Sequence, residues 1–356
     1  MPKYKFNDIA TNSTLKKKPV ESDRYTYIGL EHLDSGSLKV SRWGSDIAPV
    51  GEKLIMRKGD VLFGKRRAYQ KKVAIAPFDG IFSAHGMVLR PRENVITKEF
   101  FPLFISSDYF LDEAIRISVG SLSPTINWKD LKELEFNLPS VDQQEQLAPI
   151  IWAAIKAKNA YKAQISATDE LVKSQFIEMF GNPILNDKGW PIRKINELGE
   201  NLDSRRIPIT SGNRAKGVYP YYGASGIVDY VEDYIFDEDI LLISEDGANL
   251  LARVTPIAFP ATGKVWVNNH AHVMRFSNKC TQCYVEYLLN MIDISDYVTG
   301  TAQPKLNQAK LNSIPIPTPP LETMQRFEDI VKQADKSKFT ATTTSKFTSD
   351  IMNINK

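Results

Sequence analysis

Short apolar runs, broken by Gly and Pro, recur in both halves of the chain and predict β-strands. In the first half they span residues 60–63, 72–76, 81–83, 87–90 and 135–138. In the second half they span residues 240–244, 254–259, 265–267 and 272–276. Apolar residues at helical spacing predict helices over 100–117 and 284–292. Each half is therefore predicted to be a mixed α/β domain.

The two halves repeat each other at a nearly constant offset. Residues 120–127 read GSLSPTIN and residues 300–307 read GTAQPKLN, so Gly, Pro and Asn recur 180 positions apart. Apolar positions further on match as well, for example Leu131 with Leu311 and Phe136 with Ile316. Upstream, residues 85–90 (HGMVLR) resemble residues 270–275 (HAHVMR). We infer that the chain is a tandem duplication of one unit.

A long helix is predicted over residues 142–180, where Pro149 lies in the first turns and is tolerated there. Steps of four and three residues trace a mostly apolar seam through positions 147, 151, 154, 158, 161, 165, 168, 172, 175 and 179. A helix of this length spans roughly 60 Å, and Gly181 and Pro183 end it. The seam fits ordinary packing against a domain, or an antiparallel coiled coil that fixes the distance between two domains.

A second helix is predicted to begin near Pro320, with Phe327, Ile330 and Val331 on its apolar face. Residues 340–344 (TATTT) are mostly β-branched and form helices poorly. The second helix is therefore predicted to be short or degenerate, unless it continues despite this propensity.

These elements predict an α+β fold with two repeated, pseudo-two-fold-related α/β domains joined by long helices. In the coiled-coil alternative, the two long helices pair antiparallel and separate the domains. The expected boundaries are residues 1–140 for the first domain, 141–182 for the spacer helix, 183–318 for the second domain and 319–356 for the second helix.

Composition indicates the cellular compartment and shows that charge is distributed unevenly along the chain. No run of some 18 apolar residues exists, the N-terminus lacks the apolar stretch of a signal peptide, and the two cysteines cannot form a disulfide framework. We therefore expect a cytoplasmic protein without a membrane partner. Residues 1–140 carry 22 Lys and Arg against 17 Asp and Glu, whereas residues 191–318 carry 12 against 14. The basic first half indicates contact with a polyanion, and in the second half any such contact must rest on local loops.

Catalytic motifs are missing from the sequence. It has no P-loop, no G-x-S-x-G, no H-E-x-x-H and no dinucleotide-binding glycine fingerprint. His270, His272, Cys280 and Cys283 offer four zinc ligands within fourteen residues. The first copy has no cysteine pair and carries Met87 where the second histidine stands, so strand histidines and buried cysteines are the favoured interpretation, with no bound metal.

The densest basic stretch, residues 64–72, joins two predicted strands and is expected to be an exposed loop. It holds five cations and no acid within nine residues. Such side chains neutralise phosphates, and Arg, Gln and Tyr also contact bases or sugars. The alternative is a solvated charged turn. The candidate DNA-binding residues of the first domain are Lys65, Arg66, Arg67, Tyr69, Gln70, Lys71, Lys72 and His85.

The corresponding loops of the second domain differ in chemistry. They offer Tyr, Ser, Asn, Lys and His, which contact bases and backbone but are also common in turns. The candidate DNA-binding residues of the second domain are Tyr221, Tyr222, Ser225, Asn249, Arg253, Lys264, Asn268, Asn269 and His270. One framework with two different sets of loops suggests two readers of different sequences.

The chain resembles the specificity subunit of bacterial type I restriction-modification systems over essentially its whole length. The resemblance rests on the order and duplication of residues 59–67 (GDVLFGKRR), 120–127, 138–146 (LPSVDQQEQ), 219–226 (YPYYGASG) and 239–247 (DILLISEDG). The second helix departs from the family pattern, in which it is usually as long as the first.

The resemblance implies a non-catalytic subunit whose two domains each read half of a bipartite double-stranded DNA target, with the helices as a spacer. It also implies two methyltransferase subunits as partners, and restriction subunits in the full complex. The chain itself is expected to need no cofactor, because S-adenosylmethionine, ATP and Mg²⁺ belong to the partners. The alternatives are a DNA methyltransferase or nuclease with an unrecognised motif, and a coiled-coil scaffold that binds protein.

Overall fold

The computed structural model describes residues 1–300 and 302–353. Thr301, in the second predicted turn, and the last three residues of the predicted segment 319–356 lie outside this range. The chain divides into two compact units. Unit 1 comprises Met1–Ala160 and a C-terminal segment that begins at Ser345, and unit 2 comprises Tyr161–Thr344.

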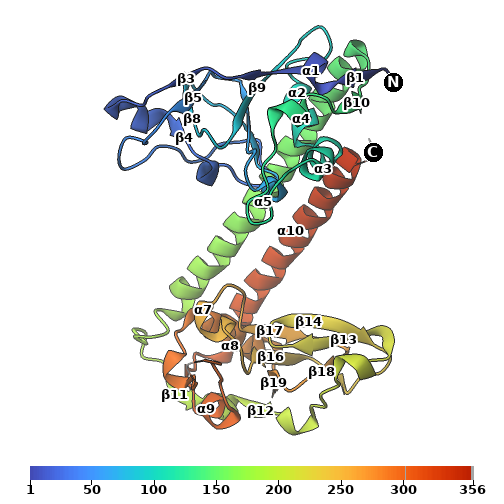
Figure 1. The fold of residues 1–356 in the computed structure, drawn as a ribbon. Helices are drawn as coiled ribbons and strands as arrows, with labels where there is room; N and C mark the ends of the chain where they lie inside the picture. The colour runs from blue at the N-terminus through green and yellow to red at the C-terminus, as the bar shows by residue number, and fades with distance from the viewer. Residues whose placement is uncertain (301, 354–356) are drawn as a thin grey trace. The chain divides into compact units, whose positions relative to one another are not determined.

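Unit 1 contains two four-stranded sheets and a two-stranded ladder (Figure 1). The first sheet has the antiparallel order β2(Ala10–Ser13)-β9(Met87–Pro91)-β6(Val61–Phe63)-β7(Val73–Ile75). The second has the order β3(Lys16–Lys17)-β5(Lys53–Met56)-β8(Gly80–Phe82)-β4(Tyr27–Ile28), in which β4 and β8 are parallel. The ladder pairs β1(Lys3–Lys5) with β10(Glu135–Asn137). The strands predicted at 60–63, 72–76, 81–83, 87–90 and 135–138 are confirmed to within a residue or two.

The short α-helices of unit 1 cover the first sheet with aromatic side chains. They are α1(Phe6–Ile9), α2(Phe101–Ser106), α3(Asp108–Arg116) and α4(Trp128–Leu131). The prediction of one helix over 100–117 was wrong, because Ser107 is extended and its hydroxyl accepts a hydrogen bond from the Phe110 amide at the start of α3. Phe6, Phe110 and Phe136 pack with ring centroids 5.0 to 6.1 Å apart and anchor this core.

Unit 2 repeats the arrangement. Its sheets have the orders β12(Gly199–Asn201)-β19(Ala271–Phe276)-β16(Ile240–Ser244)-β17(Ala258–Ala261) and β14(Gly226–Val231)-β13(Lys216–Gly223)-β18(Lys264–Val267)-β15(Phe236–Asp237). A ladder pairs β11(Ile192–Lys194) with β20(Pro315–Pro317). The short helices are α6(Ile195–Leu198), α7(Asn249–Ala252) and α9(Gln308–Asn312), and α8(Lys279–Met291) is longer. The strand predicted at 254–259 begins only at Ala258, and the helix predicted at 284–292 begins five residues earlier, at Lys279.

The duplication extends to individual pairings. In unit 1, Arg66 and Val119 each form a bridge with Thr125, and in unit 2 Asp246 and Thr299 each form one with Lys305, all 180 positions later. The units differ at the edge of the second sheet, where unit 1 adds β3 beside β5 and unit 2 adds β14 beside β13.

The two long helices are α5(Val141–Phe180) and α10(Leu321–Asn353). Within unit 2 their segments run antiparallel, because Lys338 pairs with Asp169 at 3.1 Å and the ring of Phe327 lies 5.3 Å from that of Phe176 (Figure 1). The predicted seam of α5 is confirmed there, since positions 161, 165, 168, 172, 175 and 179 are all buried or half-buried.

The prediction of a short second helix was wrong, because α10 has 33 residues and passes through the Thr-rich stretch. Tertiary contacts outweigh the weak propensity, with Ala341 buried in that stretch and Lys338 held by Asp169 just before it. No helix among the described residues is long and apolar enough to cross a membrane.

Candidate nucleic-acid interface

In each unit a turn with a positive-φ glycine packs against the loop that leaves the central strand of the first sheet. In unit 1 this turn contains Gly120, whose φ of 107° favours glycine, and the Ile126 amide donates to the Lys65 carbonyl at 2.9 Å. In unit 2 the turn contains Gly300, with φ of 83°, and the Leu306 amide donates to the Glu245 carbonyl at 2.8 Å. The same backbone frame therefore presents the candidate loops of both units.

The loop of unit 1 presents two arginines and a tyrosine to solvent. Arg66, Arg67 and Tyr69 are exposed, and Arg67 takes a left-handed conformation with φ of 54°. The Arg66 Nε donates to the Ser123 hydroxyl at 3.0 Å, which ties this side chain to the neighbouring turn. The loop joins the antiparallel strands β6 and β7, so the predicted exposed connection between two strands is confirmed.

The five cations of this loop differ in their contacts. Lys71 forms ion pairs of 2.9 and 2.7 Å with Asp108 and Asp112 on α3. Lys72 donates its ammonium to the Leu30 carbonyl at 2.6 Å. Lys71 and Lys72 therefore have intramolecular partners, in contrast to the sequence-based grouping of all five cations as equivalent. Gln70 is half-buried beside them.

Lys16 and Lys53 lie close to this basic surface, and each also has an intramolecular partner, Glu52 and the Gly51 carbonyl respectively. Burial, together with the charge of Lys16, lowers the pKa of Lys65. Partial burial and the charges of Arg66, Lys65 and Lys53 lower the pKa of the His85 imidazole, although the residue as a whole is exposed. Lys16 and Lys53 lie on the neighbouring strands β3 and β5 and were missed from the sequence, where the only signal was the basic run at 16–18.

Unit 2 places opposite charge on the same frame. Glu245 and Asp246 occupy the positions of Lys65 and Arg66, as the shared amide bond and bridge show. The Asp246 carboxylate lies 2.8 Å from Nδ1 of the exposed His270. A carboxylate at this position cannot bind a phosphate in the way that Arg66 can.

Several candidates in unit 2 have structural roles. Tyr221 is 1% exposed, and its hydroxyl bonds to the Ile209 backbone, so the structure removes it from any direct contact with DNA. Arg253 donates to the carbonyls of Leu289 and Ile292 at the end of α8. Asn249 makes two hydrogen bonds with the Thr255 backbone. These contacts give Arg253 and Asn249 structural roles that require no ligand.

The other candidates of unit 2 lie near the surface, with one exception. Ser225 and Asn269 are exposed, as is Lys264, whose ammonium lies 4.6 Å from the Tyr234 ring centroid. Tyr222 is half-buried on β13. Asn268 is buried and accepts a hydrogen bond from the His270 amide at 2.8 Å, which shapes the loop that carries His270.

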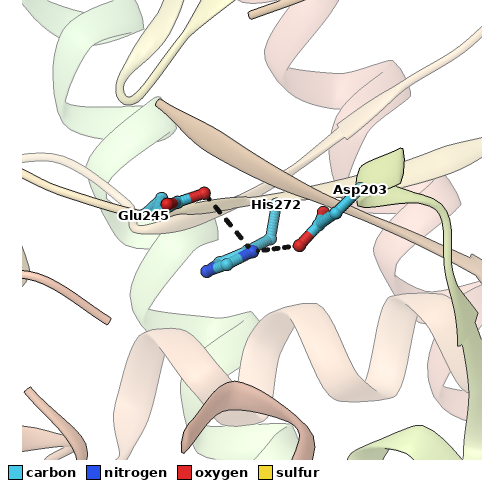
Figure 2. A group of neighbouring side chains, drawn as sticks. All are labelled: Asp203, Glu245 and His272. Atoms are coloured by element: carbon cyan, nitrogen blue, oxygen red, sulfur yellow. Dashed lines mark hydrogen bonds and ion pairs between the residues drawn. The ribbon is translucent and has the colours of Figure 1, made fainter. Parts of the chain in front are cut away.

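A buried cluster lies beneath these loops, made of Asp203, Glu245 and His272 (Figure 2). Their potential ligand atoms lie within 4.8 Å of one another, and among the described residues this is the group with metal-binding spacing. Arg206 and Lys305 pair with the two oxygens of Glu245 at 2.6 and 3.1 Å, so positive charge already neutralises this carboxylate. The donor set therefore fits a salt-bridge network better than a divalent cation.

The four residues of the zinc hypothesis do not form one ligand set. His270 bonds to Asp246, and His272 bonds to Asp203 and to the Leu306 carbonyl. Cys280 belongs to the hydrophobic core, and Cys283 packs against that core. Burial and nearby carboxylates raise the pKa of the Cys283 thiol, which disfavours the thiolate that zinc needs.

Comparison with known proteins agrees with the duplicated fold. The family described as the type I restriction modification DNA specificity domain matches residues 3–168 and 187–347. A putative type I restriction enzyme specificity subunit of Haemophilus influenzae is 36% identical over 143 residues, which cover 40% of this chain and 36% of that protein. The type I restriction enzyme MjaIX specificity subunit of Methanocaldococcus jannaschii is 26% identical over 285 residues, covering 68% of this chain and 63% of that protein. The chain thus matches less than two thirds of the length of either relative.

A solved structure supports the same architecture. The crystal structure of a type I restriction-modification system S subunit from M. genitalium superimposes with a TM-score of 0.65 at 14% identity, over 99% of this chain and 94% of that one. The duplicated α/β units and the long helices are thus the fold of that S subunit, and the family match covers both units. The chain belongs to the type I restriction modification DNA specificity family, which matches both of its halves.

Proposed function

We propose that each unit reads one half of a bipartite, asymmetric double-stranded DNA target. The observation that carries this proposal is the reversal of charge on a shared frame, with Arg66 in unit 1 and Asp246 in unit 2 at equivalent positions. Arginine donates to phosphates and guanine, whereas a carboxylate repels phosphates and accepts from cytosine. Two readers built in this way recognise different sequences.

In unit 1, Arg66, Arg67 and Tyr69 are the residues proposed to contact DNA first, because they are exposed and lie on the loop fixed by the Gly120 turn. Lys65 and His85, with Lys16 and Lys53 nearby, extend the positive surface around that loop.

In unit 2, the residues proposed to contact DNA are Ser225, Lys264, Asn269 and His270, with Tyr222 at the margin. Asp246 joins them as an acceptor beside His270. The base contacts of unit 2 therefore rest on hydrogen bonding more than on phosphate neutralisation.

The long helices are proposed to set the spacing between the two half-sites and to dock two methyltransferase subunits, with restriction subunits added in the full complex. The continuous 40-residue α5, which begins in unit 1 and ends in unit 2, supports the spacer role. S-adenosylmethionine, ATP and Mg²⁺ are proposed to bind to those partners, and the assembly is proposed to act on DNA in the cytoplasm.

The test replaces Arg66, Arg67 and Tyr69 together by Ala and assembles the chain with its methyltransferase partner. The complex selects duplexes from a random library, and sequencing gives the motif of each half-site. We expect the variant to lose base preference in one half-site and to keep the other unchanged.

The matched control is Lys3→Ala with Lys5→Ala, which also removes two positive charges from unit 1. These lysines lie on β1 and not on the loop, and they are ion-paired with Glu135 on β10 and with Glu133 just before it. The control should keep both half-sites. Equal loss at both half-sites in the triple variant, or no loss at either, would contradict independent readers. Heat of binding on titrating S-adenosylmethionine into the isolated chain would favour a catalytic subunit instead.

A further inference from the structure

The buried imidazole of His272 is at the centre of a charged network beneath the second reading surface. His272 lies on β19, Asp203 lies in the short 3-10 turn Asp203–Arg205 after β12, and Glu245 directly follows β16 (Figure 2). The three residues are 0%, 9% and 8% exposed. Buried charges of this kind persist where they are paired and hydrogen-bonded.

Both ring nitrogens of His272 face oxygen atoms that only accept hydrogen bonds. Nδ1 lies 2.6 Å from Asp203 Oδ2, and Nε2 lies 2.7 Å from the Leu306 carbonyl oxygen. A nitrogen without its proton would direct a lone pair at one of these oxygens, so this geometry favours a proton on both nitrogens.

Both carboxylates beside the ring have lowered pKa values. Burial alone would raise the pKa of Asp203, but the hydrogen bond and charge of His272, together with the Val273 amide and the charge of Arg206, lower that pKa. The other Asp203 oxygen accepts from the Val273 amide at 2.8 Å. Burial would likewise raise the pKa of Glu245, and the bond from Arg206 and the charge of His272 lower it.

The network joins four separate segments of unit 2. His272 connects the strand β19 to Asp203 on one side and to the turn at Leu306 on the other. Arg206 bridges Glu245 and the Ala271 carbonyl at 2.6 and 2.8 Å. The proposed contact residues Asp246 and His270 lie one and two residues from members of this network.

Unit 1 holds the equivalent loops without this charge. Met87 pairs with Phe63 as His272 pairs with Ile243, so the two residues occupy equivalent positions in β9 and β19. Met87 belongs to the hydrophobic core of unit 1 and has no proton to donate.

We infer that His272, as an imidazolium, is a positioning residue for the second reading surface. Its charge holds Asp203 and the Leu306 turn in place and thereby sets the geometry of the loops that carry Asp246 and His270. Base preference at the second half-site therefore depends on the charge of His272, and preference at the first does not. This inference rests on the proposed function of two independent readers.

The first measurement is the protonation of the ring in the chain assembled with its methyltransferase partner. The chain has four histidines, and nitrogen-15 labelling of histidine with a His272→Met variant assigns the signal. We expect the resonance pattern of an imidazolium at pH 7, with both nitrogens protonated. A ring with one protonated nitrogen overturns the inference, whatever the variant does to DNA binding.

The second measurement is half-site selection by the double variant Asp203→Asn with His272→Met. The asparagine keeps an acceptor for the Val273 amide and leaves no buried carboxylate without a partner, so the fold is retained. We expect selectivity at the second half-site to fall at least about tenfold while the first stays within about twofold, since a tenfold change corresponds to one modest hydrogen-bonding contact.

Undiminished selectivity at the second half-site, or equal loss at both, overturns the inference and leaves the proposed function standing. A wild-type complex that selects no sequence at all overturns the proposed function together with the inference. The two failures are therefore distinguishable in one experiment.

Discussion

Glu286 on α8 should make unit 2 less stable as the pH rises from 4.5 to about 8, because its carboxyl group is held neutral in the folded state. Burial, and then the negative charge of Asp335, raise the pKa of Glu286 from 4.5 to about 8, against the opposing charge of Lys338. The Lys338 ammonium is itself occupied by Asp335 at 2.9 Å and by Asp169 at 3.1 Å. The substitution Glu286→Gln is the test, because glutamine cannot ionise.

The sign and size follow from the linkage between protonation and folding. Between pH 4.5 and about 8 the folded state binds more protons at Glu286 than the unfolded state does, so stability falls as pH rises through this window and levels off above it. A difference of one in pKa is worth about 1.4 kcal/mol, which gives an upper bound of about 5 kcal/mol. The side chain is half-buried and keeps some contact with water. We therefore expect about 2 kcal/mol, a value reduced for this solvent screening.

The assay is urea unfolding of the wild type and of Glu286→Gln at pH 5, 7 and 9. The variant should match the wild type at pH 5 and be more stable by about 2 kcal/mol at pH 9. The control is Glu322→Gln on α10, because the Glu322 side chain is 78% exposed and should change stability by less than about 0.5 kcal/mol at every pH. No gain at pH 9, or the same gain at pH 5 and pH 9, would refute the reasoning.

Two further variants test a buried hydrogen bond and helix propensity. Tyr221→Phe removes the hydroxyl that bonds to the Ile209 backbone and should cost about 1–2 kcal/mol in urea unfolding, with the base preference of both half-sites unchanged. A changed base preference at either half-site would indicate that Tyr221 contributes to the DNA interface. Thr342→Ala with Thr343→Ala replaces two exposed residues of α10 by a better helix former and should add about 1 kcal/mol. A loss of stability would show that the threonines make contacts that alanine cannot replace.

The sequence predicted most of the scaffold, because its signals are local. Strands such as β16 and β19 are short apolar runs between turn residues, and α5 is a long heptad pattern between Ser140 and Gly181. The duplication was visible because the turn needs glycine at the same backbone position in both units, where φ is positive. Even the reversal of charge between the loops could be read from residues 180 positions apart.

Helix propensity gave the wrong prediction where a tertiary contact outweighed it. The Thr-rich stretch predicted an end to the second helix, but α10 continues through it, with Ala341 buried. At Ser107 the opposite occurred, since periodicity predicted one helix and a side-chain cap divided it into α2 and α3. Periodicity measures which face is apolar and does not detect a single hydrogen bond that ends a helix.

The roles of the polar candidates were decided by the tertiary structure alone. The sequence gives Lys71 and Arg66 the same charge, but Lys71 faces two aspartates on α3 and Arg66 faces solvent. It likewise cannot show that Tyr221 is buried and Ser225 exposed. His272 meets Asp203, 69 positions away, and Leu306, 34 positions away. The local pattern determined the elements and their repetition, whereas the partners of each charge depend on contacts between distant segments, which form only when the chain is folded.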